Sequence, residues 1–107
     1  MTDVTGGEGK KIVVTIDKDL EDLVPGYIEN RYGDIKGIRA ALASSDFDSI
    51  RVLGHSMKGS GGGYGFDAIT DIGKAIEDAA KAGNSAAISD AVERLFRYLG
   101  QVEVVYE

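Results

Sequence analysis

Residues 47–66 read FDSIRVLGHSMKGSGGGYGF, and this stretch decides how the rest of the chain is interpreted. Its apolar side chains recur three or four positions apart, at Phe47, Ile50, Leu53 and Met57. This spacing predicts an α-helix that turns one face towards a core. The pair Ser45-x-x-Asp48 resembles a capping box that opens the helix. The run of glycines after residue 60 is expected to end it near Gly65.

The same period continues on the N-terminal side. Apolar side chains spaced by three, four and seven occur at Leu20, Leu23, Val24, Tyr27, Ile28, Ile35, Ile38 and Leu42. Pro25 interrupts this pattern early, but proline is tolerated in the first turn of a helix. We therefore expect a short helix near 19–24 that leads into a long helix over about 25–43.

Two more helices are predicted after residue 66. Asp67 is expected to cap the first of them and Gly83 to close it, while Asn84 or Ser85 caps the second. The inward positions of the first are Ile69, Ile72, Ile76 and Ala79. Those of the second are Ile88, Ala91, Val92, Leu95, Tyr98 and Leu99.

The predicted fold is all-α, because short connections make neighbouring helices antiparallel. We expect one domain, an up-down four-helix bundle over residues 18–107 with a short extra N-terminal helix. Residues 1–17 are expected to be flexible or extended. The β-branched segments 12–16 and 102–106 either pair with each other or lie along the bundle. With no dimerisation helix in view, the expected state is a monomer.

Composition excludes several classes of function. The formal net charge is −6, which argues against nucleic acid as a partner. There is no cysteine, so thiolate metal sites and disulfides are impossible, and one histidine among scattered acids predicts no metal site. No apolar run approaches the roughly 20 residues of a membrane span, and no signal pattern opens the chain. A cytoplasmic protein without membrane contact is expected.

His55 is the chain's one histidine. A helical step is about 100°, so His55 lies roughly 160° from both Leu53 and Met57 and points away from the core. Lys58 and Gly59 follow at three and four positions, on the same face. From periodicity alone, an ordinary solvent-facing histidine and a solvated lysine explain these positions equally well.

The glycines on the same face as His55 favour a functional role for this histidine. An interior glycine costs a helix about 1 kcal/mol relative to alanine. Gly59 and Gly62 therefore make more sense if another protein must approach His55 closely. Val52, about 60° away around the helix, adds an apolar edge to the same patch.

The pattern His55-x-x-Lys58-Gly59, followed by Gly62, Gly65 and Phe66, resembles the signature of histidine-containing phosphotransfer domains. The likeness covers roughly residues 18–106. It implies that His55 is phosphorylated, at Nε2, and that Lys58 contacts the phosphoryl oxygens. Gly59 would give the partner room, within a docking patch that includes Val52, Gly62 and Gly65.

The resemblance also implies a role for Glu77, at a position where family members place a Gln or Glu against the imidazole. A solvent-facing acid explains Glu77 equally well. The implied partners are receiver domains of response regulators, which supply the acceptor aspartate and Mg²⁺, and a hybrid histidine kinase. The resemblance implies that the chain carries a phosphoryl group between receiver aspartates, or from a histidine kinase to a response regulator. The chain itself would need no cofactor and would have no kinase activity of its own.

Two other functions are weighed against this one. An adaptor bundle could bind receivers without being phosphorylated, although an adaptor has no need of the imidazole. A hydrolase with His55 as base lacks an apparent nucleophile with an orienting acid. No Walker or dinucleotide-binding glycine pattern is present, because Lys58 is followed by Gly59 rather than Ser or Thr.

Overall fold

Pro25 fixes where the first helix begins. The structure, a computed structural model, describes residues 11–107. In it α1 spans Val24–Ala43 and has Pro25 in its first turn, where a missing N–H costs nothing. The short helix expected near 19–24 is absent; a single 3₁₀ turn, η1 (Lys18–Leu20), stands in its place. An α-helix over 19–24 could not run on into α1, since Pro25 has no N–H for the carbonyl of Glu21.

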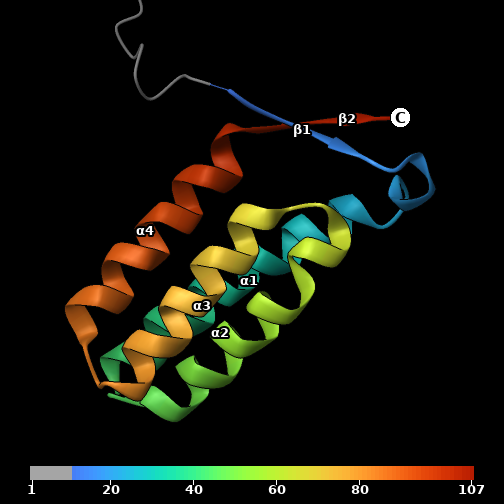
Figure 1. The fold of residues 1–107 in the computed structure, drawn as a ribbon. Coiled ribbons are helices and arrows are strands. Elements are labelled where there is room, and N and C mark those ends of the chain that lie inside the picture. The colour runs from blue at the N-terminus through green and yellow to red at the C-terminus, as the bar shows by residue number, and fades with distance from the viewer. Residues whose placement is uncertain (1–10) are drawn as a thin grey trace, which may run out of the picture.

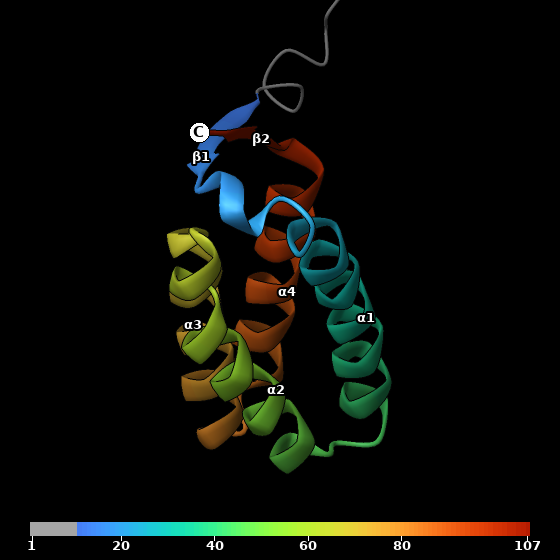
Figure 2. The same ribbon diagram turned by 90° about the vertical axis from the view of Figure 1, so that its right-hand side faces the viewer.

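The other three helices are α2 (Phe47–Ser60), α3 (Asp67–Lys81) and α4 (Ser85–Gln101). They alternate in direction with α1, as Figures 1 and 2 show, so the expected antiparallel four-helix bundle is confirmed. The core is rich in isoleucine, with Ile38, Ile50, Ile69, Ile76 and Ile88 fully buried. Phe47 and Leu53, predicted to face the core, are only partly buried at its edge. Within residues 11–107, none of the helices combines the length and apolar character that crossing a bilayer requires.

A small sheet is the departure from an all-α fold. Strand β1 (Ile12–Ile16) pairs in parallel with β2 (Val102–Tyr106), so that Ile12 lies opposite Val102 and Ile16 opposite Tyr106. Of the two arrangements that the sequence left open for these segments, pairing is the one observed. Both strands lie at the end of the bundle where α1 begins and α4 ends (Figures 1 and 2). Residues 1–10 of the expected N-terminal segment lie outside the described residues.

The turn into α2 corrects the predicted cap. Ser45 has a left-handed backbone, with φ of 56°, and its N–H bonds back to the carbonyl of Leu42. It therefore closes α1 instead of opening α2. The actual N-cap is Asp46, whose carboxylate accepts from the backbone N–H of Ser49 at 3.1 Å and from its hydroxyl at 2.6 Å.

The turn into α3 also differs from the prediction. Helix α2 ends at Ser60, earlier than expected, and the 3₁₀ turn η2 (Gly62–Tyr64) follows it. Gly65 then adopts φ of 91°, a conformation that glycine reaches without strain. Phe66 precedes α3 and gives it no side-chain cap, so the expected cap, Asp67, is instead its first residue. Asn84 does cap α4, with its side chain accepting from Ala87 N–H at 3.0 Å.

Candidate functional site

Two buried glycines bring the backbones of α2 and α3 together. A Cβ added to Gly54 would lie 2.7 Å from the backbone nitrogen of Glu77, and one added to Gly73 would lie 2.5 Å from that of Lys58. No side chain fits in either place, so the crossing requires glycine on both helices. These two residues were not predicted. The available signal was their position inside helices, where glycine is unfavourable by about 1 kcal/mol.

The crossing places an acid beneath the histidine. Glu77 is buried, at 4% exposure, while the side chain of His55 remains 65% exposed in keeping with its helical phase. His55 Nδ1 and Glu77 Oε2 are 2.9 Å apart. The alternative that Glu77 is a solvent-facing acid is wrong, because it is the one buried charged side chain among the described residues.

Two lysines share the same carboxylate. Lys58 Nζ lies 2.7 Å from Glu77 Oε1, and Lys81 Nζ lies 3.8 Å from Oε2. The hydrogen bond from Lys58 is the largest of the causes that lower the pKa of Glu77, to about 2, with further contributions from His55 and Lys81. Glu77 is therefore ionised at neutral pH and compensates the positive charge around it.

An ionised carboxylate fixes the tautomer of His55. A carboxylate can only accept hydrogen bonds, so the proton must reside on Nδ1 of the imidazole. In the neutral imidazole this tautomer leaves the lone pair on Nε2. The arrangement is that of an oriented nucleophile: an acid holds one nitrogen while the other is free to react.

A threonine on α3 forms hydrogen bonds with the backbone at the end of α2, beside Lys58. The hydroxyl of Thr70, on α3, donates to the carbonyl of Lys58 at 3.2 Å and accepts from the N–H of Gly62 at 2.8 Å. Gly61 makes this possible, since an added Cβ would lie 2.7 Å from Thr70 Oγ1. This second contact between the helices was not predicted, because it joins residues on different elements.

The predicted docking residues fall into two groups. Gly59 has no neighbouring atom within 4 Å of an added Cβ, so it leaves open space beside His55, and Val52 is 51% exposed one turn earlier. For Gly62 and Gly65, the local structure also explains why glycine occupies the position. Gly62 donates to Thr70, and Gly65 has a positive φ and a Cβ direction that points at Ile16, 3.2 Å away.

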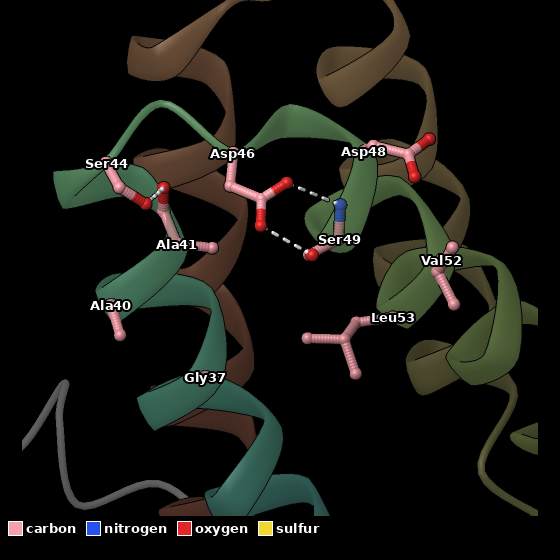
Figure 3. Close-up of a pocket in the computed structure, with 9 residues that line it drawn as sticks. All are labelled: Gly37, Ala40, Ala41, Ser44, Asp46, Asp48, Ser49, Val52 and Leu53. Atoms are coloured by element: carbon pink, nitrogen blue, oxygen red, sulfur yellow. Dashed lines mark hydrogen bonds between the residues drawn. The ribbon is translucent and has the colours of Figure 1, made fainter.

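An open groove of about 600 Å³ lies between the end of α1 and the start of α2. Figure 3 shows its lining, which includes Leu53 and Val52 on one side and Gly37 on the other. His55 is not among the lining residues, so the groove is separate from the imidazole. Over residues 11–107, no group of three or more His, Cys, Asp or Glu side chains is placed to hold a metal ion.

Comparison with known families gives one match. The model of the Hpt domain family matches residues 22–104, which is most of the chain. The match includes all of α1, α2, α3 and α4 and ends within β2, while β1 and η1 precede it. No curated protein and no solved structure matches the chain.

Proposed function

Since the chain belongs to the Hpt domain family, whose members carry phosphoryl groups in two-component phosphorelays and are not kinases, we propose that His55 is its phosphorylated residue. The phosphoryl group would be carried on Nε2 and exchanged with aspartates of receiver domains. One observation carries the proposal: the exposed imidazole is held at Nδ1 by a buried, ionised Glu77 at 2.9 Å.

The transfer step needs little from this chain beyond that geometry. The Nε2 lone pair attacks the phosphorus of the receiver's acyl phosphate, the phosphorus–oxygen bond to the aspartate breaks, and the aspartate leaves as a carboxylate. The ring keeps its Nδ1 proton and becomes positively charged. Glu77, 2.9 Å away, stabilises that charge and so favours the phosphorylated state.

Lys58 would contact two groups in turn, the carboxylate of Glu77 and the phosphoryl oxygens. In the resting protein it bonds to Glu77 at 2.7 Å, and its side chain is 36% exposed. Its flexible stem allows the ammonium to turn towards the phosphoryl oxygens once they arrive. Lys81 lies near the same carboxylate, so Glu77 keeps a cationic neighbour after Lys58 moves.

The partner would complete the site. Phosphoryl transfer is mainly positioning and charge stabilisation, and we propose that the receiver brings the Mg²⁺ and the acceptor aspartate. Its docking surface would cover Val52 and the open backbone at Gly59, with Gly62 and Gly65 at the margin. A hybrid histidine kinase, through its own receiver, would be the upstream donor.

The test is direct phosphotransfer. The full chain is mixed with a receiver carrying labelled phosphoryl aspartate and Mg²⁺, and acid-labile, base-stable label is expected on the chain. His55→Gln should remove the label while binding of the receiver persists. Binding without label on the unmodified chain would indicate an adaptor, and label on the His55→Gln variant would place the acceptor elsewhere.

A matched control tests the docking surface. Val52→Glu places a charge where an apolar contact is proposed and should slow transfer. Leu23→Glu alters an equally exposed apolar side chain, 54% against 51%, that precedes α1 instead of lying on α2. Equal effects of the two substitutions would refute docking at Val52.

A further inference from the structure

The sheet formed by β1 and β2 is incomplete. Parallel sheets are normally covered on both faces, and two strands alone are barely stable. Here Val14 and Ile16 turn inward and pack on the bundle, but Val13 is 62% exposed and Val105 41% exposed on the outer side. Within residues 11–107, β1 and β2 pair only with each other, so each keeps one free edge.

The ladder determines which backbone groups face the free edge of β1. The N–H of Glu107 donates to the carbonyl of Ile16, and the carbonyl of Glu107 accepts from the N–H of Lys18. The backbone N–H and C=O groups of the even-numbered residues of β1 therefore point towards β2. Because strand residues alternate, the N–H and C=O groups of Val13 and Thr15 point the other way. Exposed groups of this kind are a template for another strand.

The sequence of this edge is complementary to itself. Residues 11–17 read KIVVTID, with a cation at one end, an anion at the other and five β-branched residues between them. If two copies pair antiparallel about Val14, Val13 of each lies opposite Thr15 of the other and their edge-facing groups can bond. In the same register Lys11 of each copy lies opposite Asp17 of the other, which favours this register over those shifted along the strand. Within one copy, Lys11 lies 3.7 Å from Glu103 and Asp17 accepts from the N–H of Asp19, so the new pairs would add to these exposed contacts.

We propose that β1 is a self-association edge, through which two copies of the chain form a symmetric dimer with a four-stranded sheet in the order β2-β1-β1-β2. The interface is isologous, as a two-fold axis through Val14 requires. The free edge of β2 does not suit this role. Residues 102–107 carry Glu103 and Glu107 and no basic residue, so two such edges would repel each other. The sequence analysis predicted a monomer because it considered only helices as dimerisation elements.

The first experiment measures mass in solution across a range of concentrations, by light scattering after size exclusion. Dimers are expected for the unmodified chain. Thr15→Pro removes an N–H that only the second copy would use, so the dimer should weaken about tenfold or more. Val104→Pro is the matched control, because residue 104 turns its N–H to the free edge of β2. It should leave the dimer intact.

Charge exchange tests the register. Lys11→Asp alone should weaken the dimer, since it places two acids opposite each other, and adding Asp17→Lys should restore it. Helical circular dichroism and urea denaturation report whether each variant remains folded. A monomer at every concentration, a dimer that survives Thr15→Pro, or dissociation by Val104→Pro alone would overturn the proposal, which does not depend on the proposed function.

Discussion

Replacing Gly73 with alanine should separate α2 from α3. The added Cβ would lie 2.5 Å from the backbone nitrogen of Lys58 and 2.9 Å from the carbonyl oxygen of Gly54. Ordinary contact begins at 3.4 Å, so the helices must move apart by about 0.9 Å. A third obstacle is the Cβ of Met57, 2.8 Å away. The first two are backbone atoms and the third is attached directly to the backbone, so none of them can rotate away as the far end of a side chain can.

The magnitude follows from two opposing effects. Overpacking costs about 1–3 kcal/mol, and the rigid neighbours put this site near the upper end. Alanine recovers about 1 kcal/mol relative to glycine in a helix. We therefore expect Gly73→Ala to lower the free energy of unfolding by about 2 kcal/mol. The same displacement lengthens the contacts of Glu77 with His55 and Lys58, so transfer to His55 should also slow.

Gly59→Ala is the matched control, the same chemical change in the last turn of α2. An added Cβ there meets nothing within 4 Å, so the helix effect acts alone and should raise stability by about 0.5–1 kcal/mol. Urea denaturation measures both variants on the same scale. Equal shifts of the midpoint in the two variants, or stabilisation by Gly73→Ala, would refute the close crossing of α2 and α3.

Three further outcomes are expected. Glu77→Gln should keep the fold but slow phosphorylation of His55 by about tenfold, because the charge-assisted bond to Nδ1 is lost; an unchanged rate in single-turnover transfer would contradict this. The pKa of Glu77 is lowered to about 2, so its ionised form stabilises the folded chain above its usual pKa of about 4.5. That contribution should be lost as pH falls from about 4.5 to 2, and Glu77→Gln should show a flatter decline when midpoints are compared across this range. Asp46→Ala should cost about 1 kcal/mol in urea denaturation through loss of the cap, and no loss would mean that Ser49 N–H finds another acceptor.

Local pattern was enough for much of the fold. A helix places side chains at a fixed angle per residue, so the sequence predicts that His55 lies opposite the core stripe and that Lys58 shares its face. Gly83 and Asn84 mark a helix end and a helix start for equally local reasons. Local pattern failed at Ser45 because its role depends on a backbone angle, and the carboxylate of Asp46, one residue later, was free to cap α2 instead.

The sequence by itself determined which helical face carries the imidazole, and only the tertiary structure decided what holds it. His55 and Glu77 are 22 residues apart, and their contact depends on how closely α2 approaches α3. The pairing of β1 with β2 likewise joins the two ends of the described chain. Helical phase follows from bonds within one segment, whereas the distance between segments depends on which side chains are missing at Gly54 and Gly73.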